Sequence, residues 1–172
     1  MTTLHRSVVV SLALLAFGGA AAATAHAASL SGLDKQYLTS AIQGDRFEIA
    51  GGKLAQTKSQ NAKVQALGAR LVKDHTKSLH EAVRLAHAFN VSVPKAPSPS
   101  ERWELTVVSS LTGTSFDKWY ASLEVADHHQ DISEAADEVS DGANKQVRSS
   151  AHKEIPTLRI HLRLSEEALK SA

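Results

Sequence analysis

The sequence predicts an all-α protein built as a bundle of four long helices. Apolar residues recur every three or four positions through four long segments, and no segment shows the two-residue alternation of a β-strand. The second and third segments are separated by residues 91–114, far more than an antiparallel hairpin needs. A connection of that length lets the third helix run parallel to the second, which is the topology of a ferritin-like four-helix bundle with one long crossover.

The first two predicted helices span residues 34–57 and 62–89. The apolar stripe of the first helix carries glycines, although a glycine inside a helix costs about 1 kcal/mol relative to alanine. We interpret Gly44, Gly51 and Gly52 as small residues that let a neighbouring helix approach closely.

The long crossover between the second and third helices is predicted to carry a short extra helix. Residues 91–100 contain three of the four prolines and predict an extended linker. The short helix follows, opened by Ser100 and Glu101 and ending near Gly113.

Polar capping residues mark where the other long helices begin. Asn61 precedes the second helix, Ser115 the third and Asn144 the fourth. The third helix is predicted to end at Asp141 and Gly142.

The first 27 residues predict a secretory signal peptide, which leaves residues 28–172 as one ferritin-like four-helix bundle domain. A short basic start precedes an apolar run from Val8 to Ala23, and Ala25-His26-Ala27 forms the cleavage site. The run is shorter than the roughly 20 residues that a membrane-spanning helix needs. We therefore expect an exported, periplasmic protein with no transmembrane segment after cleavage. Attachment to the surface of the outer membrane stays open.

The amino-acid composition argues against several classes of cofactor and partner. The chain has no cysteine and Met1 is its sole methionine, so we predict no iron–sulfur cluster, no haem and no thiolate zinc site. Cleavage removes Arg6 and leaves 18 of the 19 basic residues against 18 acidic ones. A neutral chain offers nucleic acid no electrostatic attraction, so we predict no nucleic-acid partner. Histidines and carboxylates remain as metal ligands.

Ionisable residues occupy the apolar stripes of all four long helices, where an unpaired charge is costly. His75, His128 and His161 lie on three of these helices, and Glu48 lies on the remaining one. These four residues predict a site in the bundle core for iron, manganese, zinc or copper, the ions that imidazole and carboxylate ligands suit. Two weaker candidate ligands share the inner faces: Glu124 and Glu154.

A second hypothesis stays open beside metal binding. The same side chains can form a buried polar network that only specifies helix packing, in a structural or stress-protective bundle. The Glu-x-x-His motif of di-iron bundles is absent, as are a Gly-x-Ser-x-Gly elbow and a glycine-rich phosphate loop. These absences favour a non-enzymatic protein and assign no catalytic residue. A stress-related role belongs to both hypotheses. An enzymatic role, the identity of the metal and homo-oligomerisation stay open.

The large aromatic residues and the remaining histidines are predicted to lie outside any site. Trp103, Trp119 and Tyr120 fall at apolar spacing and are expected to pack in the core. Four histidines fall off the apolar stripes and are expected to face solvent: His80, His87, His129 and His152.

Four motifs in a fixed order resemble one known family. They are Gly44-x3-Glu48-Ile49 before Leu54-Ala55; Leu71-Val72-x-Asp74-His75; Phe116-Asp117-x2-Tyr120 with His128 eight residues further on; and Ile155-Pro156-x-Leu158-x2-His161-Leu162. From about Asp34 to Leu169, the chain resembles an uncharacterised family of exported bacterial proteins, a domain of unknown function placed in the ferritin-like superfamily and often labelled outer membrane protein.

The resemblance implies a ferritin-like four-helix fold and an extracytoplasmic location, and it brings no assigned activity. It also singles out the four positions found on the apolar stripes: Glu48, His75, His128 and His161. Glu124 stands where that family often carries an apolar residue, so its candidacy rests on its stripe position alone.

Overall fold

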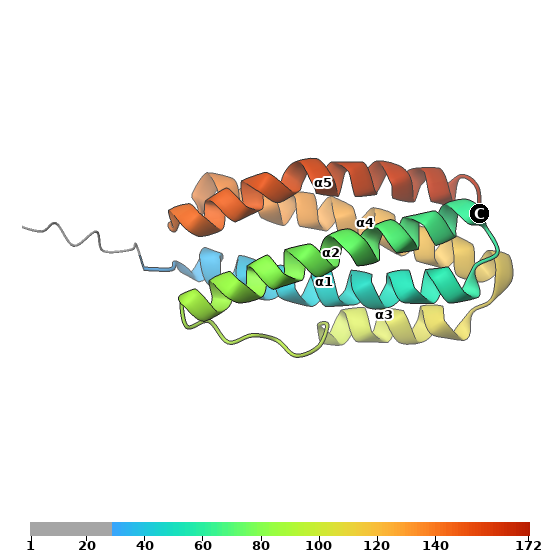
Figure 1. Cartoon of the computed structure of the whole chain (residues 1–172), viewed down its shortest axis with the longest axis horizontal. Helices are drawn as coiled ribbons and strands as arrows, with labels where there is room; N and C mark the ends of the chain where they lie inside the picture. The colour runs from blue at the N-terminus through green and yellow to red at the C-terminus, as the bar shows by residue number, and fades with distance from the viewer. Residues whose placement is uncertain (1–28) are drawn as a thin grey trace, which may run out of the picture.

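The computed structural model describes residues 29–172, which form five α-helices and, over that range, no strand (Figure 1). The helices are α1 (Gly32–Lys58), α2 (Ala62–Ala88), α3 (Pro99–Ser110), α4 (Gly113–Asp141) and α5 (Lys145–Leu169). The all-α prediction is therefore confirmed. None of these helices combines the length and apolar character needed to cross a lipid bilayer. The predicted signal peptide lies outside the described residues, so it and the domain boundary stay predictions.

Two helical hairpins face each other to make the bundle. α1 packs mainly on α2 and α4 mainly on α5, while contacts of α1 with α4 and of α2 with α5 join the two hairpins. The connection from α2 to α4 carries α3, which lies against α1 and α4. α2 and α4 consequently run in the same direction (Figure 1). This arrangement is compatible with the predicted four-helix bundle, and its assignment to the ferritin-like class stays a prediction.

Side-chain caps begin three of the long helices. Asn61 and Asn144 each accept hydrogen bonds from the backbone amides two and three residues ahead, which confirms the predicted cap at Asn61. Ser31 and Asp34 form a capping box at the start of α1. These caps satisfy backbone donors that the first turn of a helix leaves without partners.

The start of the short helix differs slightly from the prediction. α3 begins at Pro99 instead of Ser100, and Ser98 is its cap. The reason is a capping box between Ser98 and Glu101, with a proline at a position where the missing backbone donor costs nothing.

The start of α4 corrects another prediction. Ser115, the predicted cap, lies inside the first turn, because α4 already begins at Gly113. Thr112 occupies the cap position, and its carbonyl accepts a hydrogen bond from the Phe116 amide.

Trp103 and Trp119 are exposed, so the prediction that they pack in the core is wrong. They are 65% and 51% exposed, whereas Tyr120 is buried and stacks on Phe116. Adjacent helical residues point about 100° apart, so Trp119 faces solvent when Tyr120 faces the core. The four histidines expected to face solvent do so.

A polar layer divides the bundle core into two apolar ends. One end is packed by residues that include Leu67, Leu71, Val108, Phe116 and Tyr120. The other end is packed by residues that include Tyr37, Leu38, Leu85, Val147 and Leu158. Between these two sets along the four long helices lie the buried ionisable residues Asp45, Glu48, His75, Glu124, His128 and His161.

α1 and α2 cross in close contact at Gly52 and Gly68. A Cβ atom at Gly52 would lie 2.7 Å from the carbonyl oxygen of Gly68, and a Cβ atom at Gly68 would lie 2.6 Å from that of Gly52. The interpretation of the glycine stripe therefore holds for Gly52. At Gly44 the neighbouring Asp131 would be in ordinary contact, 3.8 Å away.

Glu138, near the end of α4, is a buried carboxyl beside another carboxyl. Although burial alone would raise the pKa of Asp34, hydrogen bonds from Ser31 and from the Asn144 amide lower it. Burial and the neighbouring Asp34 carboxylate raise the pKa of Glu138 to about 8. Ionising Glu138 therefore places a second buried negative charge next to the first.

Replacing Glu138 by glutamine is expected to raise the free energy of unfolding by about 1 kcal/mol above pH 8, the scale of one unsatisfied buried group. At about pH 6 Glu138 is protonated and glutamine resembles it, so little change is expected there. Urea titrations at both pH values measure the difference. Asp137→Asn, at an exposed carboxyl one residue away, is the control. A gain that is the same at both pH values would contradict the prediction.

Candidate metal centre

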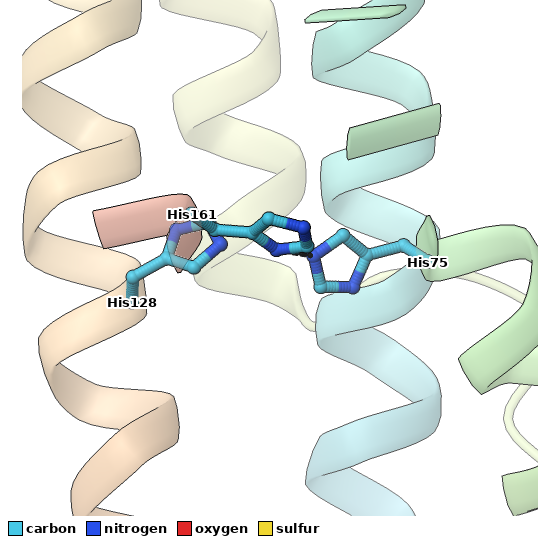
Figure 2. A group of neighbouring side chains, drawn as sticks. All are labelled: His75, His128 and His161. Carbon is cyan, nitrogen blue, oxygen red and sulfur yellow. Dashed lines mark hydrogen bonds between the residues drawn. The ribbon is translucent and has the colours of Figure 1, made fainter. Parts of the chain in front are cut away.

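Three buried imidazoles from three helices meet in the polar layer. His75 comes from α2, His128 from α4 and His161 from α5, and each is at most 4% exposed. Their ring centroids lie 5.0 to 5.7 Å apart. Figure 2 shows the three side chains reaching toward one another across the core. The structure thus brings together the three histidines that the sequence singled out.

His75 is held by two carboxylates from α1. Its Nδ1 lies 2.8 Å from Oδ1 of Asp45 and 2.6 Å from Oε2 of Glu48. A carboxylate accepts hydrogen bonds, so this arrangement assigns the proton to Nδ1. The other ring nitrogen, Nε2, points to the centre of the histidine group.

The outer nitrogens of the other two histidines also face acceptors. His161 Nε2 lies 3.0 Å from Oδ2 of Asp74, whose side chain is partly exposed. His128 Nδ1 lies 2.7 Å from the backbone carbonyl oxygen of Glu124. Both contacts place the ring proton on the outer nitrogen, away from the centre.

When His75 is neutral, these proton positions leave three nitrogen lone pairs facing the centre. His75 Nε2 and His161 Nδ1 lie 3.2 Å apart, and His128 Nε2 is buried without a hydrogen-bond partner. Each of the three residues offers a ligand nitrogen within 4.8 Å of the others. Two lone pairs at hydrogen-bond distance repel each other unless a cation or a proton lies between them. The geometry therefore suits a metal ion.

Glu48 joins the histidine group from α1. Its carboxylate is fully buried, with Oε2 against His75 and Oε1 3.1 Å from His128 Nε2. Neither oxygen has a hydrogen bond of normal geometry. All four residues predicted as metal ligands therefore lie in one cluster.

The two weaker candidates lie at different places. Glu124 is inside the cluster, where its carboxylate comes within 3.8 Å of His128 and shares a ligand group with Glu48 and His128. Glu154 lies apart from these groups and accepts a hydrogen bond from the Ser78 hydroxyl at 2.9 Å.

Three further carboxylates of the cluster were not predicted. Asp45 lies with Glu48 and His75, and Asp127 and Asp131 lie with Glu48, in groups whose ligand atoms are within 4.8 Å of one another. The sequence contained a signal for Asp45 and Asp131, because each is three residues from a predicted ligand on the same helix and so shares its face.

One protein family matches most of the chain. The sequence profile of the family described as "Domain of unknown function (DUF4142)" matches residues 19–167. The chain belongs to the DUF4142 family. No curated protein matches it.

A solved structure shares the fold of this DUF4142 chain. It is the crystal structure of a DUF305 fragment from Deinococcus radiodurans, with a TM-score of 0.73. The two are 14% identical, and the match covers 84% of this chain and 99% of the other. At this identity the likeness shows the fold alone.

Two of the buried histidines in this DUF4142 chain are neutral at pH 7. Burial and the neighbouring His75 lower the pKa of His128 to about 3 and that of His161 to about 4. His75 differs: burial alone would lower its pKa, but the hydrogen bond to Asp45 and nearby acids raise it. Neutral imidazole is the form that binds metal ions, so His128 and His161 are ready to do so.

Carboxyl groups outnumber bases in the polar layer of the DUF4142 chain. Burial and repulsion from neighbouring acids raise the pKa of Glu124 to about 8 and that of Asp127 to about 7. The same two causes raise the pKa values of Glu48 and Asp131. A cation in the layer would favour the ionised form of all four groups.

A surface groove of about 630 Å³ between α2 and α5 reaches the histidines. Its lining includes His75 and His161, together with Asp74, Ser78 and Glu154. The volume is that of a small-ligand site. An ion in solution therefore has a route to the buried imidazoles of the DUF4142 chain.

Proposed function

We propose that the protein binds one transition-metal ion in its core, with His75, His128 and His161 as three ligands and Glu48 as the fourth. The observation that carries the proposal is the polarity of the three rings. Each holds its outer nitrogen against an acceptor and turns the other nitrogen toward a common centre. Metal-binding histidines are oriented in this way by a carboxylate or carbonyl that accepts from the second ring nitrogen.

The proposed role is metal handling and not catalysis. Imidazole and carboxylate ligands suit zinc, copper, iron and manganese. Four side-chain ligands close a tetrahedral site, whereas a catalytic site keeps one position open. We place this role in an exported, periplasmic protein of the ferritin-like class that acts under stress. The predicted signal peptide is the ground for proposing export, and the family motifs are the ground for proposing the ferritin-like class.

A purely structural polar network is the second candidate function. The observation that favours it is a continuous chain of contacts from Asp74 through His161 and His75 to Asp45, which becomes a hydrogen-bond chain when His75 carries a proton on both ring nitrogens and donates from Nε2 to His161. Such a chain can fix helix packing without any ion. It leaves the buried carboxylates of Glu48 and Glu124 without hydrogen-bond donors of normal geometry, which is costly in a network whose purpose is packing.

Zinc titration of the chelator-treated protein tests the proposal. Calorimetry is expected to give one tightly bound zinc ion per chain, and cobalt(II) in its place is expected to show the intense visible absorption of a tetrahedral site. His128→Ala is expected to weaken binding about 100-fold or more, because loss of an outer partner alone costs about 10- to 100-fold.

His129→Ala is the matched control, because His129 is the exposed neighbour of His128 on the same helix. It is expected to bind zinc like the wild type. If the wild type takes up less than one zinc ion per chain, or if the two variants bind zinc equally well, the metal proposal is wrong and the packing network is the better explanation.

A further inference from the structure

A second, much smaller cavity lies beside the histidine group. Its volume is about 20 Å³, and its walls include Asp45, Glu48 and His75 from one side and Asp131 and Glu154 from others. A cavity of that size holds one water molecule or one ion. Its polar lining consists mainly of carboxylates.

Carboxylates that line this cavity belong to two groups, and the ligand atoms within each group are close enough to share one ion. Glu48, Asp127 and Asp131 offer oxygens within 4.8 Å of one another, and so do Asp45 and Glu48 together with His75. Glu48 belongs to both groups, and Asp131 belongs to one group and also lines the cavity. The oxygens therefore converge from α1 and α4.

Two of these side chains are deeply buried and have oxygens without donors. Glu48 Oε2 contacts His75 and Oε1 contacts His128, but neither oxygen has a hydrogen bond of normal geometry, and Oδ2 of Asp45 has no hydrogen-bond partner. The side chains of Glu48 and Asp45 are 1% and 3% exposed. Both line the small cavity. Unpartnered buried carboxylate oxygens of this kind point to a cation as the missing partner.

When all of them are ionised, the carboxyl groups of the layer carry more negative charge than one divalent ion can neutralise. Six carboxyl groups lie in it: Asp45, Glu48, Glu124, Asp127, Asp131 and Glu154. Among the described residues no lysine or arginine is buried to offset them. A divalent ion at the histidines leaves an excess of negative charge, which falls mainly on the carboxylates of α1 and α4.

We propose that a second divalent cation binds in this small cavity, ligated by oxygens of Glu48 and Asp131, with Asp45 and Asp127 completing its surroundings. The inference rests on the proposed histidine site, because Glu48 is shared between the two positions. The second position is expected to bind a different class of ion from the histidine site. Carboxylates and water select hard cations such as Mn²⁺, Mg²⁺ and Ca²⁺, whereas the imidazole position selects zinc, copper or iron.

Titration of the zinc-saturated full chain with Mn²⁺ tests the second position. Free Mn²⁺ gives a sharp six-line electron paramagnetic resonance signal that broadens on binding, so bound and free ions are counted directly. One Mn²⁺ per zinc-loaded chain is expected. Asp131→Asn is expected to weaken Mn²⁺ binding about 10-fold or more, with zinc stoichiometry unchanged.

Asp137→Asn is the matched control, because Asp137 is an exposed carboxyl on the same helix. It is expected to bind Mn²⁺ like the wild type. His161→Ala gives the converse test: it removes a zinc ligand and leaves the carboxylates, so Mn²⁺ binding is expected to survive while zinc binding is lost.

The outcomes separate the two proposals. Zinc-saturated protein that binds no Mn²⁺, or an Asp131→Asn variant that binds it as tightly as Asp137→Asn, overturns the second position and leaves the histidine site intact. Wild-type protein that binds no zinc overturns the histidine site instead.

Discussion

Replacing Gly52 by alanine is expected to lower the free energy of unfolding by about 3 kcal/mol, near the upper end of the usual range for an overpacked core. The added Cβ would lie 2.7 Å from the Gly68 carbonyl oxygen and 2.9 Å from Val72 Cγ2. The first of these atoms is backbone, so relief requires α1 and α2 to move apart. Gly68→Ala is expected to cost a similar amount, because its Cβ would meet the Gly52 carbonyl oxygen.

Thermal and urea unfolding measure these two substitutions. For a chain of this size a loss of about 3 kcal/mol lowers the melting temperature by roughly 10 °C. Gly32→Ala is the matched control, because a Cβ there would have nothing within 4 Å. It is expected to be neutral or slightly stabilising, since alanine restricts the unfolded chain. Equal melting temperatures for Gly52→Ala and Gly32→Ala would contradict the close crossing.

Metal-free protein is expected to lose stability as the pH rises from about 6.5 to 8. Burial and neighbouring acids raise the pKa of Glu124 to about 8 and those of Asp127 and Glu154 to about 7. In the unfolded chain these carboxyls are ionised throughout that range. The folded chain therefore holds more protons than the unfolded chain, and raising the pH lowers the free energy of unfolding.

The histidines do not reverse this trend. The lowered pKa values of His128 and His161 favour the folded chain as the pH rises through about 6.5, the pKa of a free imidazole, and this gain is complete about one pH unit higher. The raised pKa of His75 acts in the same direction as the carboxyls. Between pH 6.5 and 8 the histidine contribution therefore fades while the carboxyl contributions grow, so the net trend is a loss of stability.

A bound metal ion is expected to invert the pH dependence. Metal binds the deprotonated ligands, so binding releases protons and strengthens with pH. Urea titrations at pH 6.5 and pH 8, with chelator and with excess zinc, provide the measurement. The chelator-treated protein should be less stable at pH 8 and the zinc-loaded protein more stable there. Chelator-treated protein that is as stable at pH 8 as at pH 6.5 would refute the charge assignment.

The central ligands could be predicted from the sequence because each lies in the middle of an apolar stripe. An apolar or small residue lies one helical turn away, on at least one side, from each of the four ligands: His75, His128, His161 and Glu48. Helical periodicity alone turns such residues inward. Their convergence at one height was not predictable, because it depends on the relative shift of four helices.

The surrounding carboxylates lie at the edges of the apolar stripes, where helical periodicity alone does not predict whether a side chain is buried. Asp127 and Asp131 are half-buried on α4, and whether such residues face a neighbour depends on how closely the helices pack. On the α1 side of α4 the packing is close at Gly51, where an added Cβ would lie 3.3 Å from Glu124 Oε1, and such contacts are visible only in the folded chain. Trp119 shows the same limit in the opposite direction: apolar spacing predicted burial, and the structure exposes it.

The three histidines are divided between the two helical hairpins, and this division has a mechanical consequence. His75 belongs to the α1–α2 hairpin, whereas His128 and His161 belong to the α4–α5 hairpin. An ion bound to all three would fasten one hairpin to the other, as a disulfide does in many exported proteins. This cysteine-free chain would then hold a reversible cross-link whose strength follows the free metal concentration. Metal scarcity would loosen the molecule along the seam between the hairpins.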